Sequence, residues 1–554
     1  MEGKSKAMRD LNRVKNVAKD LRKMIKNKGK DNHDTNRKKV KTELVRNKHG
    51  VITDPFFIKQ AEKHLNKAAI VDKTFPSEVV IKFLSMQGDE LCSDMIVPIE
   101  TTSLDLNIMI NKIKKDLETT SYVFLIDNIE VKANILDTLK RLANFESEKV
   151  VKVIYRPESI FSVKPLTRAS STLEGHTDSI LSVQFSPNGQ HLASGGGDCI
   201  VRFWDTDTET PLFSSDSEVN NENNVNHSNW ILCLSFSPCG TMLASGSVDG
   251  VYIIWDPTTG APLSRAVKAH SKWITSLVWK PMHLDIDCKY ILTTSKDGFL
   301  KIWNVILGHC ILSLQAHEDS ITKAIWSGEN FIYTCSQDKL IKVWDENGTC
   351  MKVLKGHAHW INTMTINNEF ILRTGCFDTE NKFAFNENRE VMFTKAKKRY
   401  ENFKEKVNTH EKIVTGSDDF TLILWDPLNS DKPISRMTGH QGLVNQVAFS
   451  PDTFYLASAS FDKGIKIWNG HTGEFICNLR GHVGPVYQIA WSPDSRLLLS
   501  GSKDSTLKCW NVKVKRLMHE LPGHADEVYC VDWSPDGFKA VSGSKDRRLR
   551  IWKN

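Results

Sequence analysis

His and Asp residues recur along this chain at spacings that could bring them together as proton-exchanging pairs. A His is followed some twenty to thirty residues later by an Asp and, six residues after the Asp, by a Trp; this happens seven times, and an eighth copy is interrupted. Because buried polar groups need one another as partners, we interpret the pairs as structural rather than catalytic. The spacing is identical in five copies: His176/Asp198/Trp204, His227/Asp249/Trp255, His440/Asp462/Trp468, His482/Asp504/Trp510 and His524/Asp546/Trp552.

Four residue types of one copy can form a chain of hydrogen bonds, in which the Trp N–H donates, a Ser hydroxyl bridges and the Asp meets the His in a tight turn. We call such a set a tetrad. The tetrads with Ser are His176, Ser194, Asp198, Trp204; His440, Ser458, Asp462, Trp468; His482, Ser500, Asp504, Trp510; and His524, Ser542, Asp546, Trp552. A period of about forty residues that opens with Gly-His resembles the WD40 repeat, in which each copy forms a four-stranded propeller blade.

The resemblance implies a mainly β fold with an eight-bladed propeller over residues 161–554. Its units close at Trp204, Trp255, Trp303, Trp344, Trp425, Trp468, Trp510 and Trp552. Since Trp552 lies two residues from the end of the chain, the segment from Phe161 to Leu173 should supply the missing outer strand and close the ring.

The fifth unit is interrupted. Residues 372–378 look like a blade strand and turn, yet Trp425 follows a second such turn at residues 416–419. The pattern predicts an insertion at about 379–410, with a helix around Ala396 to Lys406. Long insertions are either binding elements or disordered.

Two further parts precede the propeller. Residues 1–75 are predicted to be a basic, partly helical arm with 21 Lys and Arg against 9 Asp and Glu. Such an arm could bind nucleic acid or be a solvated tail. Residues 76–160 predict a small α+β domain of order strand, strand, helix, strand, strand, which resembles the ubiquitin-like fold; the pattern places its main helix from Leu104 to Leu117 with Ser103 as the cap.

Several function classes find no support in the sequence. It contains no phosphate-binding loop, no Gly-x-Ser-x-Gly turn and no His-Glu-x-x-His motif, so we expect no enzymatic activity. The 12 cysteines are scattered without a Cys-x-x-Cys pair, which indicates neither a zinc cluster nor a disulfide framework. We also expect no membrane-spanning segment, because no long apolar run occurs.

Two groups of residues are candidates for partner binding. Trp230, Trp273 and Trp360 each stand three residues after a repeat His, where the innermost strand begins; they could be exposed binding anchors or could pack between neighbouring blades. The Asp turns also carry cations, which could contact a phosphate backbone or be merely solvated. They include Lys296, Lys503, Lys545, Arg547 and Arg548.

Linked motifs make the resemblance more specific. They include Tyr155-Arg-Pro-Glu-Ser-Ile-Phe, His270-Ser-Lys-Trp-Ile-Thr, His357-Ala-His-Trp-Ile-Asn, Arg436-Met-Thr-Gly-His-Gln and Arg480-Gly-His-Val-Gly-Pro-Val-Tyr. Together with the interrupted fifth unit, these motifs resemble the Notchless family of ribosome assembly factors over residues 76–554.

The resemblance implies a factor for maturation of the large (60S) ribosomal subunit, in the nucleolus and nucleoplasm. It implies a monomer within a large assembly, whose propeller docks on pre-ribosomal proteins, with rRNA as a further candidate partner. The ubiquitin-like domain would bind the metal-ion-dependent adhesion site (MIDAS) domain of midasin, an AAA+ ATPase. Glu148, seven residues ahead of Tyr155, would complete the Mg²⁺ sphere of that partner, with Glu146 as the nearest rival. No cofactor of its own is implied.

Two other functions fit the same sequence. One is a signalling or ubiquitin-pathway scaffold, for example one that binds a Notch-type receptor tail. The other is direct RNA binding through the arm and the turn cations as the main activity.

Overall fold

The computed structural model of the chain describes residues 78–84, 90–91, 94–114, 122–126, 129–131, 134–140, 150–157, 163–216, 225–377, 388–407 and 410–554. The arm at residues 1–75 lies outside these residues. No helix among them combines the length and the apolar composition that crossing a membrane requires.

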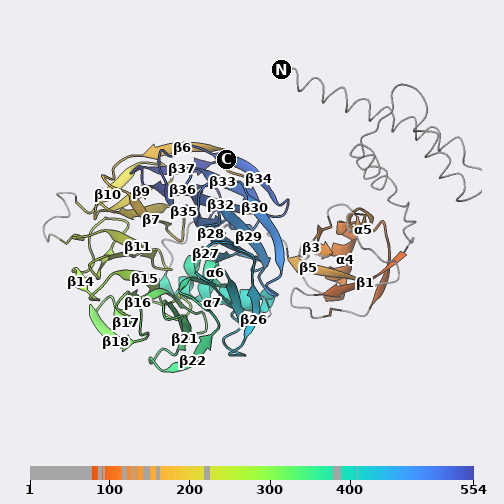
Figure 1. Cartoon of the computed structure of the whole chain (residues 1–554), viewed down its shortest axis with the longest axis horizontal. Helices are drawn as coiled ribbons and strands as arrows, with labels where there is room; N and C mark the ends of the chain where they lie inside the picture. The colour runs from red at the N-terminus through yellow and green to blue at the C-terminus, as the bar shows by residue number, and fades with distance from the viewer. Residues whose placement is uncertain are drawn as a thin grey trace, which may run out of the picture. The chain divides into compact units, whose positions relative to one another are not determined.

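The first described part is a five-stranded sheet with two helices (Figure 1). Its strands run in the order β2-β1-β5-β3-β4, with β1 and β5 parallel. The predicted series of strands and helix is present, and β4 is an additional short strand. The elements are β1 (Glu78–Leu84), β2 (Met95–Pro98), α4 (Ser103–Lys114), β3 (Tyr122–Ile126), β4 (Ile129–Glu130), α5 (Ile135–Leu139) and β5 (Val151–Pro157).

Alternation along β1 explains how this sheet buries a core. Ile81 and Phe83 are buried on one face of the strand, and Leu106 and Ile110 of α4 are buried at helical spacing. The cap of α4 differs from the prediction: Thr102, not Ser103, holds the helix start. The Asp105 N–H donates to Thr102 Oγ1 over 3.3 Å, and the Thr102 N–H donates back to the Asp105 carboxylate over 3.1 Å.

Eight four-stranded antiparallel sheets follow as blades one to eight of a propeller. Blade one contains β7 (Ile180–Phe185), β8 (His191–Gly196), β9 (Val201–Asp205) and β10 (Pro211–Ser214). Blade two contains β11 (Ile231–Phe236), β12 (Leu243–Ser247), β13 (Val251–Trp255) and β14 (Val267–Lys268). Blade three contains β15 (Ile274–Trp279), β16 (Tyr290–Ser295), β17 (Phe299–Asn304) and β18 (His309–Gln315). Blade four contains β19 (Ile321–Trp326), β20 (Ile332–Ser336), β21 (Leu340–Trp344) and β22 (Cys350–Lys355).

Blade five contains β23 (Ile361–Ile366), β24 (Ile413–Ser417), β25 (Leu422–Trp425) and β26 (Pro433–Met437). Blade six contains β27 (Val444–Phe449), β28 (Tyr455–Ser460), β29 (Gly464–Asn469) and β30 (Phe475–Arg480). Blade seven contains β31 (Val486–Trp491), β32 (Leu497–Ser502), β33 (Leu507–Asn511) and β34 (Arg516–Leu521). Blade eight contains β35 (Val528–Trp533), β36 (Ala540–Ser544), β37 (Leu549–Lys553) and β6 (Arg168–Leu173).

The ring closes in blade eight as the sequence predicts. β6 pairs with β37 across the two ends of the propeller, with Leu173 opposite Leu549 and Arg168 opposite Lys553. Blades eight and one share a hydrophobic core, since Leu549 of blade eight packs in one cluster with Phe185 of blade one. Closure therefore pairs an edge that would otherwise be open to other chains.

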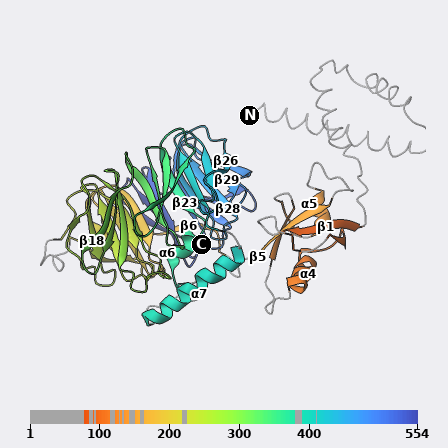
Figure 2. The same cartoon turned by 90° about the horizontal axis from the view of Figure 1, so that it is seen from below.

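The insertion in blade five is larger than predicted, because it occupies the whole connection between β23 and β24. The expected strand over residues 372–378 is wrong: Glu369–Thr374 form the helix α6, and the chain then turns at Gly375 with φ 55°. A second helix, α7 (Arg389–Val407), runs along one face of the propeller (Figure 2). Strand-like residue types were misleading here because helix contacts with other blades decide the conformation.

Candidate functional site

The tetrads lie buried between the strands of their blades. In blade one, His176 Nδ1 lies 2.8 Å from Asp198 Oδ2, His176 Nε2 lies 2.7 Å from Ser194 Oγ, and Trp204 Nε1 donates to Ser194 Oγ over 2.9 Å. The three other Ser tetrads have the same contacts, through Ser458, Ser500 and Ser542. Each His is buried and both of its ring nitrogens are engaged in hydrogen bonds within the tetrad, so neither nitrogen is free to exchange a proton with a substrate.

Blades two to five vary this arrangement. Thr replaces Ser in blades three, four and five, where Thr293, Thr334 and Thr415 accept from the blade Trp. In blade two, His227 still contacts Ser245, but its Nδ1 is buried without a hydrogen-bond partner. Burial lowers the pKa of His227 to about 4, so it is neutral at physiological pH. Asp249 accepts from Ser228 instead, which explains how the unusual opening of blade two retains its turn.

The three candidate Trp side chains are exposed on one face. Trp230, Trp273 and Trp360 are 51%, 42% and 43% exposed. Each Trp carbonyl accepts an N–H from the turn that carries the tetrad Asp, so the Trp residues share the face of those turns. They belong to blades two, three and five; in blade four, Ser320 takes the corresponding position and its carbonyl accepts from Gln337. The polar Ser320 therefore occupies, in blade four, the position that Trp273 and Trp360 occupy in the blades on either side.

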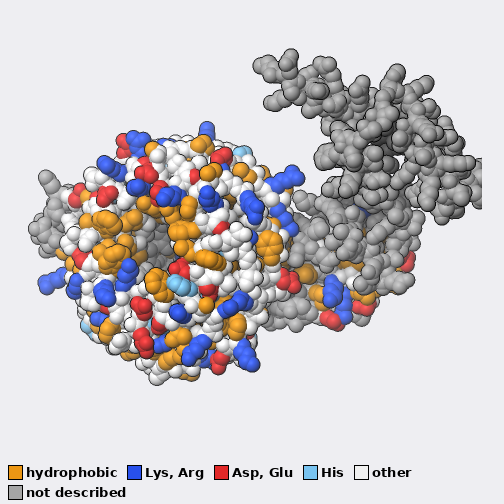
Figure 3. Space-filling model, in the orientation of Figure 1, with side chains coloured by type: hydrophobic (Ala, Val, Ile, Leu, Met, Phe, Trp, Pro, Cys, Tyr) orange, Lys and Arg blue, Asp and Glu red, His pale blue; other side chains and the backbone are white. Residues whose placement is uncertain are grey.

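Most of the candidate cations on these turns have a partner. Lys296 Nζ lies 3.6 Å from the centre of the Trp273 ring, a close cation–π contact. Three others pair with carboxylates: Lys503 with Glu527, Lys545 with Asp526 and Arg548 with Glu174, at 3.5, 3.7 and 2.9 Å. Arg547 occupies a left-handed turn position with φ 66°. The face drawn in Figure 3 likewise interleaves cations and carboxylates, so these turns do not form a continuous ring of positive charge.

Sequence patterns missed the contacts that bind the insertion to the propeller. Arg373 of α6 donates to both carboxylate oxygens of Asp532 in blade eight, one of them over 2.9 Å. Asp532 also accepts the backbone N–H groups of Phe185 and Trp533, over 2.8 and 2.9 Å. The insertion of blade five thus reaches the innermost strand of blade eight. No local pattern signals a partner 159 residues away.

A buried carboxylate, Glu411, joins the end of the insertion to blade four. It accepts from the Gly328 N–H over 2.9 Å and from Asn368 Nδ2 over 2.7 Å, and also from the hydroxyl of Ser327. Burial raises the pKa of Glu411, while the hydrogen bonds from Ser327 and Asn368 counteract that shift. Beside it, Tyr400 of α7 stacks on His283 with ring centres 4.1 Å apart.

The two acidic candidates, Glu148 and Glu146, lie outside the described residues. The described chain resumes at Val150, immediately before β5. Within the described ranges, no three His, Cys, Asp or Glu side chains are grouped as a metal site would need.

The fold and the tetrads define a WD40 β-propeller protein. The family model described as "WD domain, G-beta repeat" matches residues 168–205, 222–256, 261–304, 308–345, 431–469, 473–511 and 515–553. The matches leave out the first three strands of blade five, whose first two strands the insertion separates. The crystal structure of the computationally designed Ika8 protein superposes with a TM-score of 0.54 over 71% of this chain and 100% of that one; at 23% identity it shows the fold alone.

Relatives then identify the particular family. Protein Notchless of Drosophila melanogaster is 41% identical over 381 residues, covering 68% of this chain and 75% of the relative. Ribosome assembly protein 4 of Saccharomyces cerevisiae is 41% identical over 429 residues, covering 74% and 81%. The Notchless protein homolog of Arabidopsis thaliana is 45% identical over 392 residues, covering 70% and 80%. The chain belongs to the Notchless family.

Proposed function

We propose that this protein is a non-catalytic assembly factor of the large (60S) ribosomal subunit, acting in the nucleolus and nucleoplasm. The observation that carries the proposal is its 41% identity to the yeast protein named Ribosome assembly protein 4, across 81% of that relative. The engaged nitrogens of the buried tetrad His residues also favour a structural role for these residues over catalysis.

The propeller is the proposed docking platform on pre-ribosomal particles. Its closed ring and satisfied tetrads make a rigid scaffold, and a rigid scaffold loses little conformational entropy on binding. Its exposed Trp230, Trp273 and Trp360 are the residue type most often found as binding anchors. We propose that the protein acts as a monomer within a large assembly, with the propeller as the scaffold and the exposed Trp residues as anchors.

The five-stranded sheet is the proposed contact for midasin. The order β2-β1-β5-β3-β4, with parallel β1 and β5 and a helix between β2 and β3, supports the assignment of residues 76–160 as a ubiquitin-like domain. Residues 161–554 are then the propeller. In the sequence, Glu148 stands two residues before Val150, where the described chain resumes ahead of β5.

In this proposal Glu148 offers one carboxylate oxygen to the Mg²⁺ of the MIDAS domain of midasin. Oxygen donors of this kind suit Mg²⁺, which accepts few protein ligands at a time. The metal would supply the charge that binds the two proteins together, and the remaining ligands would belong to midasin. Glu146, two residues away, has the same chemistry and serves as the matched alternative.

The test measures binding of the full chain to the midasin MIDAS domain with and without Mg²⁺. We expect Glu148→Ala to abolish binding, chelation to have the same effect, and Glu146→Ala to leave binding intact. Unchanged binding by Glu148→Ala would refute the metal-ligand role. Sedimentation with large pre-ribosomal particles tests the assembly role separately, and its absence in wild type would refute it.

A further inference from the structure

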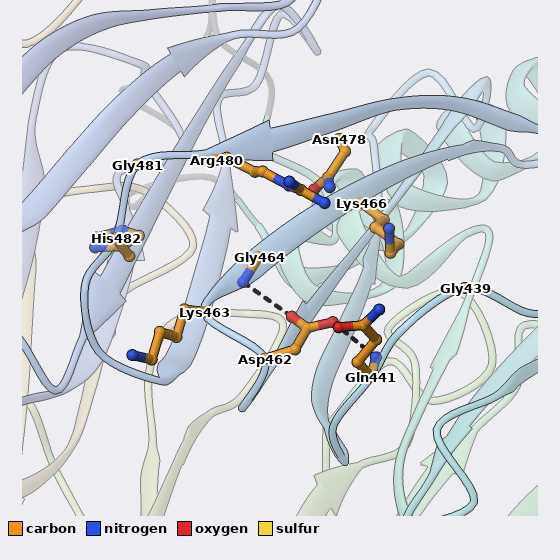
Figure 4. Close-up of a pocket in the computed structure, with 10 residues that line it drawn as sticks. All are labelled: Gly439, Gln441, Asp462, Lys463, Gly464, Lys466, Asn478, Arg480, Gly481 and His482. Carbon is orange, nitrogen blue, oxygen red and sulfur yellow. Dashed lines mark hydrogen bonds between the residues drawn. The ribbon is translucent and has the colours of Figure 1, made fainter.

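A pocket of about 330 Å³ opens in blade six, where β29 and β30 meet the loops before β27 and β31 (Figure 4). Ten residues line it: Gly439, Gln441, Asp462, Lys463, Gly464, Lys466, Asn478, Arg480, Gly481 and His482. Three of these side chains are cations and one is a carboxylate. We refer to this site as the basic pocket.

Strand register explains why the space exists. Gly464 pairs with Arg480 and Lys466 pairs with Asn478 in the ladder between β29 and β30. Lys466 and Arg480 are therefore diagonal neighbours on one face, and Gly464 opposite Arg480 contributes no side chain to fill the gap. Figure 4 draws Arg480 beside Asn478, with Lys466 below them, whereas Lys463 extends away from the other two cations.

The single carboxylate does not neutralise these cations, because its oxygens are used by the blade. Asp462 lies 2.7 Å from His440 Nδ1 and accepts the N–H groups of Gln441 and Gly464 over 3.0 and 2.9 Å. Burial opposes ionisation of Asp462, but the contact with His440 and the N–H bonds from Gln441 and Gly464 together lower its pKa to about 2. Across the part of the chain that the structure describes, no carboxylate lies within 4.0 Å of the Nζ of Lys466 or the guanidinium of Arg480.

In three other blades the lysine that corresponds to Lys466, two positions before the tetrad Trp, has a hydrogen-bond or ion-pair partner. Lys301 donates to the Ala269 carbonyl over 2.7 Å, and Lys342 to the Ala316 carbonyl over 2.8 Å. Lys508 pairs with Glu520. Among the described residues, Lys466 and Arg480 are thus neighbouring cations without a carboxylate or carbonyl partner, and an anion in the basic pocket can supply one.

An exposed aromatic ring adjoins the same lysine. Phe475 of β30 is 52% exposed, and Lys466 Nζ lies 5.3 Å from the centre of its ring. The Trp468 ring packs edge-on against the Phe475 ring, with ring centres 5.4 Å apart. Cations that contact a backbone, next to an aromatic ring on which a base can stack, are the combination that proteins use for single-stranded nucleic acid.

We propose that the basic pocket binds a phosphodiester of single-stranded RNA, with Arg480 and Lys466 contacting the phosphate and Phe475 stacking on the adjoining base. The guanidinium of Arg480 can donate two parallel hydrogen bonds to phosphate oxygens. The proposal rests on the proposed function only in that a ribosomal precursor supplies such RNA, and it is independent of midasin. An acidic or phosphorylated peptide matches the cations but leaves the exposed ring unused.

The test measures fluorescence anisotropy of a labelled short oligouridine with the full chain at several KCl concentrations. Loss of the phosphate contact in Lys466→Met/Arg480→Ala should weaken binding on the order of tenfold, and should reduce the salt slope by about 0.7, since one phosphodiester carries one charge. Phe475→Ala should weaken binding on the order of tenfold at an unchanged salt slope, because stacking releases no counterion. Lys355→Ala, at the position of Arg480 in blade four, should bind as wild type.

Circular dichroism and binding to the MIDAS domain are measured on the same preparations, and both should match wild type. Failure of the RNA site is thereby distinguished from failure of the proposed function. In wild type, 4-thiouridine in the oligonucleotide should crosslink to the peptide that contains Phe475. The proposal is overturned if the double variant keeps the wild-type affinity and salt slope, or if an Asp/Glu-rich or phosphoserine peptide occupies the pocket and oligouridine does not.

Discussion

Glu411 offers a direct test of how the insertion is held to the propeller. Its carboxylate accepts from four buried donors, on Ser327, Gly328, Asn368 and Tyr333. Glu411→Ala leaves these donors without an acceptor, at a cost of about 1–3 kcal/mol each. The substitution also ends the cost of burying a carboxylate, so we expect a net loss of about 3 kcal/mol, below the low end of that sum.

The measurement is hydrogen–deuterium exchange over α6, α7 and the Gly328 turn. A loss of about 3 kcal/mol in local stability corresponds to roughly a hundredfold faster exchange through local opening. Glu405→Gln, on the exposed side of α7, is the control and should exchange as wild type. If Glu411→Ala exchanges within about threefold of wild type, the insertion is held by other contacts and the reasoning is wrong.

The same residue predicts a pH dependence. Because burial raises the pKa of Glu411, the folded protein keeps this proton at pH values where the unfolded chain has released it. Stability therefore falls as pH rises from the ordinary Glu pKa through the raised one. Glu411→Gln lacks this dependence, so its deficit relative to wild type should shrink as pH rises. A deficit that grows with pH in denaturant unfolding would contradict the assignment.

Two further predictions concern buried polar contacts. Arg373→Met should destabilise the protein by about 2–3 kcal/mol in denaturant unfolding, because it removes the charged partner of buried Asp532. Arg389→Met, which breaks an exposed pair with Asp287, should cost less than about 1 kcal/mol, and equal losses would contradict this account. Ser500→Ala should cost about 2–3 kcal/mol because it leaves the buried His and Trp of its tetrad unpaired. Ser500→Thr introduces the residue type that blades three to five have at this position, and its stability should be close to that of wild type. Equal melting temperatures of the Ala and Thr variants would refute the bridging role.

Local sequence predicts the blades well because each blade is a local structure. The strands and the tight turn that joins them lie within about forty residues, so residue types at fixed spacing suffice to indicate them. The closing strand β6 was predictable from its place directly ahead of the first repeat His, and it pairs with β37. The helix cap at Thr102 was misassigned by one residue, because Ser103 and Thr102 are equally good caps by type.

The candidate site was likewise predictable from the sequence only in part. The exposure of Trp230, Trp273 and Trp360 followed from their shared position after a His, which the repeat makes equivalent. The partners of the turn cations could not be predicted from the sequence, because Lys503 and Arg548 pair with carboxylates that belong to neighbouring loops. The basic pocket likewise escaped prediction: in the sequence Lys466 looks like Lys342 and Lys508, and only their surroundings differ.

The sequence by itself determined a WD40 propeller of eight blades, its closure and its family. Only the tertiary structure decided that residues 369–374 are a helix, that Arg373 pairs with Asp532 in blade eight, and that Glu411 is buried. The physical reason is the range of the contacts. Periodicity and turn chemistry act between residues close in the chain, whereas the energies of a buried ion pair or carboxylate depend on groups that meet only when the ring has closed.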